Sequence, residues 1–251
     1  MEEKILTGKQ ILVVDDEADL RYIVAYELEF MGADVFQVEN ISKAKDFLDI
    51  RPIDLIVSDI RMPGGTGIDL LNYIKTKNTF SPPIVLITGF ADIPLENAFN
   101  QGAEALLSKP FRLDDLVELS AKLTSKIEDR YVTNRKFTTE PNKLSIKFND
   151  SISEKISRGE FAIGRGGMSI MVINRSFKCD LGEVLDFKII FRDLTLEGSA
   201  VCRWWKPDKN ENSVFGFEFL HLSQETFNYF NSYWKDHTII PFIPSLQERH
   251  I

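Results

Sequence analysis

The sequence predicts an α/β domain with a parallel sheet, followed by a domain of antiparallel strands. Four short apolar runs in the first half each end on a polar residue and alternate with helical patterns, which is typical of buried parallel strands. In the second half, apolar and polar residues alternate without intervening helices. The length of 251 residues accommodates two such domains.

The first domain is expected to span residues 8–128 and to form a five-stranded, doubly wound sheet with helices on both faces. Gly32 is expected to close the first helix, and Pro63, Gly64 and Gly65 to make a loose loop that can move. The strands are expected near residues 10–14, 34–38, 53–58, 83–87 and 105–107, and the helices near 18–31, 41–50, 67–76, 92–101 and 113–128.

Reactive polar residues stand at the ends of four of these strands. Asp15 and Asp16 follow I-L-V-V, Asp59 follows L-I-V-S, Thr88 follows I-V-L-I, and Lys109 follows A-L-L-S. Because ligands bind at the carboxyl ends of parallel strands, we expect these side chains to meet in one crevice. Three carboxylates repel one another there unless a cation joins them, and oxygen ligands of this kind suit Mg²⁺. The pattern predicts a phosphoryl-transfer site in which the lysine is a second positive charge.

These residues and their motifs resemble the receiver domain of two-component response regulators. The matching strings are D-D-E at the first strand end, D-I-R-M-P around Asp59, T-G-F at Thr88 and S-K-P-F at Lys109. The resemblance implies that Asp59 accepts a phosphoryl group from a histidine kinase or a phosphotransfer protein. Thr88 would hydrogen-bond the phosphoryl oxygens and Lys109 would pair with them. A cis Lys109–Pro110 peptide bond is also implied.

The resemblance also implies a metal site and a mode of signalling. Asp16, Asp59 and the backbone carbonyl of Arg61 would hold Mg²⁺, and Asp15 would assist through water. Receivers usually carry Tyr or Phe three residues before the lysine, but this chain has Leu106, which weakens the usual relay from threonine to aromatic residue. Receivers often form homodimers, and such a dimer is expected here from the family alone.

Composition limits the classes of function. Residues 1–128 hold 13 basic and 22 acidic residues, a net charge of −9, and residues 129–251 hold 17 and 16, a net charge of +1. Without a basic stripe or a helix-turn-helix pattern, we expect no DNA binding. No apolar run is long enough to span a membrane, no signal peptide is recognisable, and two cysteines without ligand spacing fit a reduced, cytoplasmic setting. No catalytic constellation is evident in the second half, so we do not expect an enzyme.

The second half is expected to be a linker at residues 129–140, an antiparallel barrel with a C-terminal helix at 141–238, and an apolar tail at 239–251. The linker is either flexible or a rigid helix. The helix carries Phe227, Phe230 and Trp234 on one face, which we expect to pack across the barrel mouth. The tail is too apolar to stay in water and is expected to pack on a domain or a partner. The strand-like strings are K-L-S-I-K-F, E-V-L-D-F-K-I-I-F, L-E-G-S-A-V-C-R-W-W and S-V-F-G-F-E-F-L.

This half resembles the PilZ domain through G-R-G-G-M-S-I, the following L-G-E, V-C-R-W-W and V-F-G-F-E-F-L. That family is best known for binding cyclic di-GMP through an R-x-x-x-R motif and D-x-S-x-x-G. Here Ala162 and Gly164 stand in place of the Asp and Ser, but Arg130, Arg135 and Arg165 remain as candidate ligands for the dinucleotide. Two outputs stay open: a protein-docking surface on a degenerate PilZ-like domain, with an unknown protein partner, or a phosphorylation-gated cyclic di-GMP receptor.

Overall fold

The structure, a computed structural model, describes residues 4–77, 82–89, 93–131, 142–173, 177–207 and 212–246. The chain divides into two compact units. The first comprises Met1–Pro94 and Gln101–Ser125, and the second comprises Leu95–Asn100 and Lys126–Ile251. None of the helices in the described ranges is long and apolar enough to cross a membrane.

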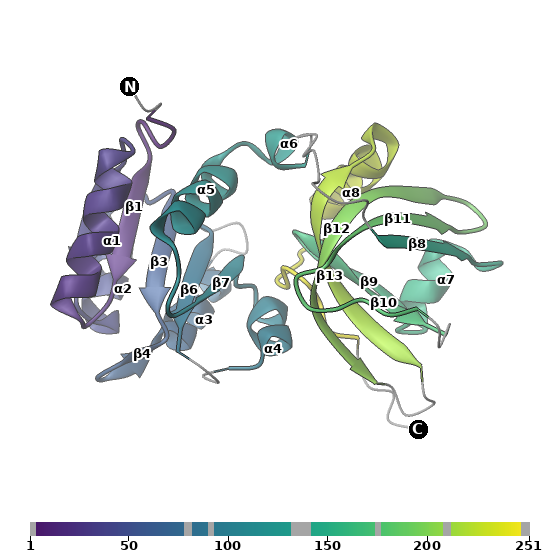
Figure 1. Ribbon diagram of the computed structural model, residues 1–251, viewed down its shortest axis with the longest axis horizontal. Helices are drawn as coiled ribbons and strands as arrows, with labels where there is room; N and C mark the ends of the chain where they lie inside the picture. The colour runs from purple at the N-terminus through teal and green to yellow at the C-terminus, as the bar shows by residue number, and fades with distance from the viewer. Residues whose placement is uncertain are drawn as a thin grey trace. The chain divides into compact units, whose positions relative to one another are not determined.

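The first unit contains the five-stranded parallel sheet that the apolar runs predict, in the order β2-β1-β3-β6-β7 (Figure 1). Each strand lies within two residues of its expected position. The strands are β1 Gln10–Val14, β2 Asp34–Val38, β3 Leu55–Asp59, β6 Ile84–Thr88 and β7 Ala105–Ser108. The helices are α1 Ala18–Phe30, α2 Ile41–Ile50, α3 Gly67–Lys77 and α5 Leu113–Thr124, while the short α4 Leu95–Asn100 groups with the second unit.

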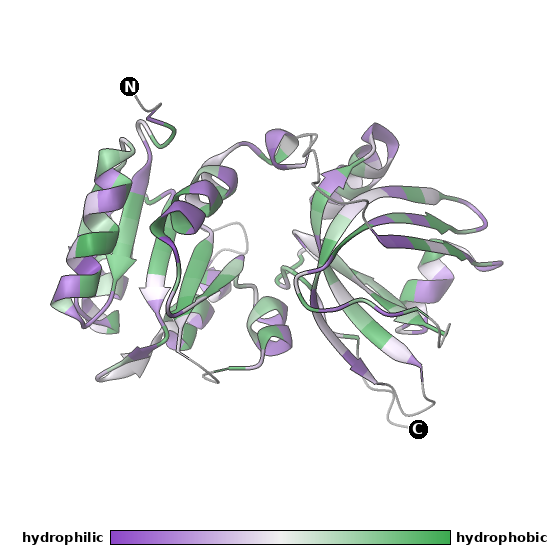
Figure 2. Ribbon diagram, in the orientation of Figure 1, coloured by the Kyte–Doolittle hydropathy of each residue, from purple (hydrophilic) through white to green (hydrophobic). Residues whose placement is uncertain are grey.

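The central strands β1, β3 and β6 are mainly apolar because both of their faces are buried, whereas the edge strand β2 carries the exposed Asp34 and Gln37. Alternate residues of a strand point to opposite faces. One set of alternate residues, which includes Ile11 and Val57, packs with Val24 and Leu28 of α1 and with Leu116 of α5 in one cluster. Figure 2 shows the result, with apolar central strands and helices that carry polar residues among their apolar ones.

The last helix of the first unit is shorter than the sequence predicts. It ends at Thr124 rather than near residue 128, and a separate single turn, α6, follows at Ile127–Arg130. Local hydrogen bonds satisfy the final carbonyl groups: Ser125 donates its hydroxyl to the Lys122 carbonyl, and Lys9 Nζ donates to the Thr124 carbonyl at 2.8 Å. These bonds end the helix although the apolar periodicity continues.

The expected loose loop after Asp59 is a hairpin. β4 Arg61–Met62 pairs antiparallel with β5 Gly65–Thr66. Gly64 and Gly65 have φ values of 83° and 159°, which side chains with a Cβ rarely adopt, and this freedom lets the two short strands turn back within two residues. The segment beside Asp59 therefore has regular structure.

The second unit contains a six-stranded sheet in the order β8-β11-β12-β13-β10-β9. Its strands are β8 Asn142–Lys147, β9 Phe161–Ile163, β10 Gly167–Val172, β11 Val184–Ile190, β12 Thr195–Pro207 and β13 Ser213–Leu222. Helices α7 Ile152–Ser157 and α8 Gln224–Asp236 accompany the sheet. The α7 turn begins at Ser151, whose hydroxyl and the Glu154 carboxylate form a reciprocal capping box.

The expected antiparallel barrel is not confirmed: the described residues form a mostly antiparallel sheet with one parallel pair, and no closed barrel is seen among them. β8 pairs parallel with β11, and β8 and β9 are the two edges. The chain passes from β8 through α7, β9 and β10 before it reaches β11, and such a crossover lets the two strands run in the same direction. The alternation of apolar residues predicts strands but leaves their relative direction undetermined.

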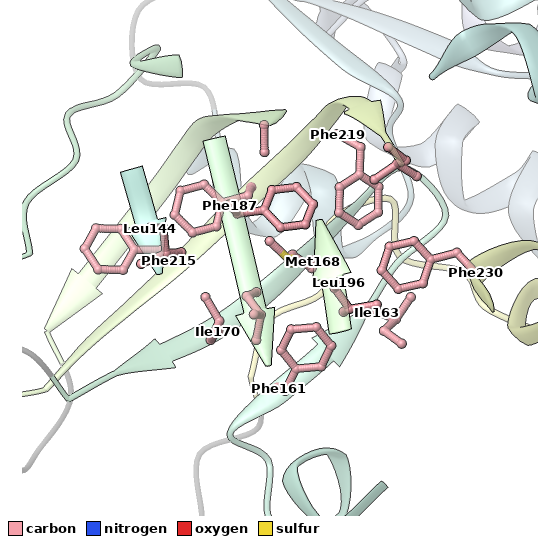
Figure 3. Close-up of a cluster of buried hydrophobic side chains, with 14 of the residues drawn as sticks. Leu144, Phe161, Ile163, Met168, Ile170, Phe187, Leu196, Phe215, Phe219 and Phe230 are labelled. Atoms are coloured by element: carbon pink, nitrogen blue, oxygen red, sulfur yellow. The ribbon is translucent and has the colours of Figure 1, made fainter. Parts of the chain in front are cut away.

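The core of this second unit is built from aromatic and aliphatic side chains of the sheet and of α8 (Figure 3). Phe219 lies between two rings, at centroid distances of 5.0 Å from Phe230 and 6.2 Å from Phe187. The aromatic stripe on α8 packs into this cluster, since Phe227, Phe230 and Trp234 are all buried, but the barrel mouth that it was expected to cover is not seen among the described residues.

Candidate functional site

Lys109 joins the carboxylates at the strand ends of the first unit. Its Nζ lies 2.7 Å from Asp59 Oδ1, 3.3 Å from Glu17 Oε1 and 3.8 Å from Asp15 Oδ2. The Lys109–Pro110 peptide bond is cis, as expected. Burial disfavours the charged form of Lys109, but its hydrogen bond with Asp59 and its attraction to Asp59 and Asp15 outweigh burial and raise its pKa above the ordinary value.

Asp59 is held at the end of β3 by the backbone around it. Its Oδ2 accepts a hydrogen bond from the Arg61 N–H at 2.6 Å, and the residue is 5% exposed. Gly67 packs against the Asp59 carbonyl so closely that a Cβ at position 67 would lie 2.5 Å from that oxygen. Gly67 is not among the residues predicted from the sequence, although a glycine at the start of a helix, shortly after a reactive strand end, is a signal of close backbone approach.

Asp15 is a buried carboxylate with one satisfied oxygen. Its Oδ1 accepts the Glu17 N–H at 2.7 Å, whereas its buried Oδ2 has no hydrogen-bond partner among the described residues. Burial raises the pKa of Asp15, although the Glu17 N–H and Lys109 act to lower it. A buried carboxylate oxygen without a donor, beside a second carboxylate, is what a cation site requires.

Thr88 ends β6, and Asp16 follows the end of β1. Thr88, at the end of β6, donates its hydroxyl to the Gly89 carbonyl at 2.7 Å, and its own carbonyl accepts the Lys109 N–H at 2.8 Å. Asp16 is exposed. Within the described ranges, no three His, Cys, Asp or Glu side chains already converge as a metal-binding group. The structure therefore brings Asp15, Asp59 and Lys109 together and leaves Asp16 and Thr88 beside them.

The candidate dinucleotide residues of the second unit are placed differently. Arg165 lies in the segment Gly164–Gly167, where its Nε donates to the Ile240 carbonyl at 3.1 Å and its backbone N–H to the Pro241 carbonyl at 2.9 Å. Arg130 ends α6, and the Tyr131 hydroxyl that follows it donates to the Arg165 carbonyl at 3.4 Å. Arg135 lies outside the described residues.

The apolar tail packs on the glycine segment of its own unit. Phe242 and Ile243 are buried, as the tail's composition predicts. A Cβ at Gly166 would lie 1.9 Å from the Phe242 ring, and a Cβ at Gly164 would lie 2.3 Å from the Phe242 carbonyl oxygen. The close approach of the tail thus accounts for glycine at both positions without a ligand.

Comparison with known proteins assigns the first unit. Residues 11–121 match the family model of the response regulator receiver domain. This range contains all five strands with the carboxylates and the lysine at their ends. Residues 11–121 are therefore a response regulator receiver domain.

The relatives of this domain include a response regulator and a transcriptional regulatory protein. The chain is 31% identical over 147 residues to the response regulator protein PilR of Pseudomonas aeruginosa, which is 57% of this chain and 33% of PilR. It is 39% identical over 118 residues to the transcriptional regulatory protein FixJ of Bradyrhizobium diazoefficiens, which is 45% of this chain and 55% of FixJ. The chain thus spans between a third and about half of the length of these two relatives.

Among solved structures, the chain resembles the response regulator TrrA of Thermotoga maritima in complex with Mg²⁺ and BeF. The identity is 31%, the TM-score is 0.41, and the match covers 46% of this chain and 98% of TrrA. The corresponding values for full-length FixJ from B. japonicum are 34% identity, a TM-score of 0.43, 47% of this chain and 58% of FixJ.

Proposed function

We propose that this protein is a response regulator that accepts a phosphoryl group on Asp59 and signals through protein contacts of its second unit. The observation that carries the proposal is the 2.7 Å contact between Lys109 Nζ and Asp59 Oδ1, next to the unsatisfied Oδ2 of Asp15. A buried carboxylate held by a lysine at a strand end is placed to act as a nucleophile toward phosphorus. A histidine kinase or a phosphotransfer protein would be the donor.

Asp15, Asp16, Asp59 and the Arg61 carbonyl are the oxygen ligands available for Mg²⁺. The solved structure of TrrA contains Mg²⁺ and BeF, which supports the same ion here. Asp15 Oδ2 fits this role best because it is buried and lacks a hydrogen-bond donor in the described part of the chain. When bound, the ion would neutralise the carboxylates and the incoming phosphoryl oxygens.

The transfer step needs little from the protein beyond position and charge. A carboxylate oxygen of Asp59 forms a bond to phosphorus while the bond from phosphorus to the donor atom breaks, and the donor leaves with the electron pair. The ammonium group of Lys109, which lies 2.7 Å from Asp59 Oδ1, would follow the negative charge onto the phosphoryl oxygens. Thr88 ends β6, the strand that pairs with β3, and its hydroxyl would be the hydrogen-bond donor to these oxygens.

Phosphorylation is expected to require a divalent ion. With acetyl phosphate and Mg²⁺, intact mass spectrometry of the full chain should detect one added phosphoryl group, and a chelator should reduce this uptake about 100-fold or more, since charge neutralisation of this kind is worth several kcal/mol. NaCl at the same ionic strength, without Mg²⁺, is the control and is expected not to restore the uptake. Equal uptake with and without Mg²⁺ would contradict the proposed metal role.

For the output, we propose a divergent PilZ-like domain that works by docking a protein. The resemblance rests on the glycine segment and the following strand strings, and the tail that packs on Gly164 and Gly166 supports docking rather than nucleotide binding. Arg165 is already bonded to the tail backbone. We assign no enzymatic activity and no DNA binding to this unit.

Titration of the full chain with cyclic di-GMP tests this output. Because Ala162 and Gly164 lack hydrogen-bonding side chains, two recognition bonds at about 1 to 3 kcal/mol each are missing, and we expect no heat of binding at micromolar concentrations. Micromolar binding that Arg165→Ala or Arg135→Ala abolishes would instead establish the cyclic di-GMP receptor. Lys235→Ala, on the exposed side of α8, is the control for loss of a surface charge.

A further inference from the structure

One edge of the second-unit sheet has unused backbone hydrogen-bonding groups. β8 pairs with β11 on one side, and no described strand pairs with it on the other. In a parallel pair, the backbone groups of alternate residues point toward the partner strand. Since the Phe148 N–H donates to the Ile190 carbonyl at 2.7 Å, the backbone groups of Ser145 and Lys147 point away from β11. These groups form the free edge.

The C-terminal end of another strand, β10, lies opposite the free edge of β8. β9 covers β10 from Met168 to Ile170, and the Met171 N–H donates to the Glu160 carbonyl at 2.9 Å. Val172, one residue further, has only β13 beside it among the described strands. Between the end of β10 and the edge of β8 lies a groove of about 400 Å³, within the range of ligand and peptide sites.

The groove has an apolar floor and a basic rim. Its apolar lining comes from both strands and from the segments that follow them, and comprises Leu144, Ile146, Phe148, Met171, Val172, Ile173 and Phe177. Lys143, Lys147 and Lys155 also line it, and no acidic residue of the described ranges does. Lys155 is neutralised by Glu160 at 2.6 Å and by Asp150 at 3.2 Å, whereas Lys143 and Lys147 are exposed and form no ion pair within the described ranges.

The polar and the apolar side chains of β8 face opposite sides of the sheet. Lys143, Ser145 and Lys147 point to solvent, and Leu144 and Ile146 point to the core. A strand added along β8 would have the same alternation, with one set of side chains over the apolar floor and the other beside the lysines. Its acidic residues would face Lys143 and Lys147, and its apolar residues would fill the groove.

We propose that this groove binds an extended peptide segment of alternating acidic and apolar residues, which adds to the sheet along β8. The proposal rests on the proposed function, since it names the kind of partner that the second unit docks. Edge lysines alone discourage strand pairing, but an exposed edge normally lacks the opposite wall and apolar floor found here. A second copy of the chain fits poorly, because antiparallel pairing of two β8 strands would bring lysines near lysines.

The test uses a fluorescein-labelled peptide, V-D-V-E-V-D-V, titrated with the full chain and followed by anisotropy. Saturable binding is expected although the chain has a net charge of −8, which opposes unspecific attraction of an acidic peptide. The peptide V-K-V-K-V-K-V is expected not to bind. Lack of binding by the acidic peptide, or equal binding of both, overturns the proposal.

Two pairs of variants distinguish the contribution of backbone hydrogen bonds to peptide binding from that of the lysine charge. Ser145→Pro removes the outward N–H and is expected to weaken binding about tenfold or more, while Ser145→Ala keeps that N–H and should bind as the wild type does. Lys147→Glu should weaken binding to a similar extent, whereas Lys235→Glu on α8 should not. Circular dichroism checks that each variant is folded. If Ser145→Pro does not fold, the binding of the peptide to Lys147→Glu tests the proposal instead. Binding that is unchanged in folded Lys147→Glu overturns the proposal.

Two further measurements show which proposal is wrong if the expected binding is not found. Light scattering that finds a dimer which Ser145→Pro dissociates, with no peptide bound, would give the edge to a second copy and overturn the peptide as occupant. Phosphorylation is measured on the same samples. If Asp59 is phosphorylated but no peptide binds, the groove proposal fails and the receiver function stands. If the peptide binds but no phosphoryl group is taken up, the groove proposal stands and the proposed receiver function fails.

Discussion

Asp59→Asn is expected to abolish phosphorylation of the chain by acetyl phosphate and Mg²⁺. The asparagine amide has no carboxylate oxygen to attack phosphorus, so the acyl phosphate cannot form. Intact mass spectrometry of the full chain should then find no phosphoryl adduct under conditions in which the wild type carries one. The effect is a complete loss rather than a reduction, because the residue supplies the reacting atom.

The fold should survive this substitution. Asparagine has nearly the same size, and its amide oxygen can still accept the Arg61 N–H that Asp59 Oδ2 accepts at 2.6 Å. Lys109 keeps Glu17 Oε1 at 3.3 Å and Asp15 Oδ2 at 3.8 Å as counter-charges. A circular dichroism spectrum that matches the wild type would confirm that the loss is chemical rather than structural.

Asp46→Asn is the matched control, because it makes the same change at an exposed position of α2. It should be phosphorylated as the wild type is. If Asp59→Asn still took up one phosphoryl group, the acceptor would lie elsewhere and the proposed role of Asp59 would be wrong. Tandem mass spectrometry after borohydride reduction, which labels acyl phosphates, would then locate it.

The receiver strands and their end residues could be read from the sequence because the physics there is local. A parallel strand buried on both faces appears as a continuous apolar run, and the residue after it falls at the functional edge of the sheet. Asp15, Asp59 and Lys109 meet as this rule predicts. The satisfied and unsatisfied oxygens of Asp15 could not be predicted, because they depend on where the Glu17 N–H points.

The second unit was harder to predict because its sequence pattern leaves two features open: the direction of the strands and the neighbour of the glycine segment. Alternation fixes which face of β8 is apolar but leaves the strand direction open, so the parallel pairing with β11 was missed. The glycine segment from Gly164 to Gly167 reads as a turn or as a ligand loop. Its actual neighbour is Phe242, about 75 residues further along the chain, and no local signal connects the two.

Breaking the buried ion pair between Lys75 and Glu104 is expected to destabilise the receiver strongly. Lys75 Nζ in α3 lies 2.9 Å from Glu104 Oε1, and both side chains are 2% exposed. Glu104 Oε2 also accepts the Ile84 N–H at 2.8 Å, at the start of β6. Removing either charge leaves the other in a low-dielectric interior, which costs about 3 to 5 kcal/mol of unfolding free energy.

A double-mutant cycle separates the pair from its surroundings. Lys75→Met and Glu104→Gln are each expected to lower the urea midpoint markedly, while the double variant should regain most of the loss. Glutamine keeps an oxygen for the Ile84 N–H, so the cycle isolates the charge. Lys77→Met is the control on the same helix, since the Lys77–Asp49 pair is solvent-exposed and a much smaller shift is expected. Additive losses in the double variant would contradict a coupled pair.

Tryptophan fluorescence gives an internal reference for this experiment. Trp204, Trp205 and Trp234 all lie in the second unit, so their emission follows the unfolding of that unit, whereas circular dichroism follows both. We expect the variants at positions 75 and 104 to shift the circular dichroism transition and to leave the fluorescence midpoint in place, because both residues belong to the first unit. A fluorescence midpoint that moves by the same amount would mean that the two units unfold as one cooperative structure, in which the stability of the receiver is shared with its output unit.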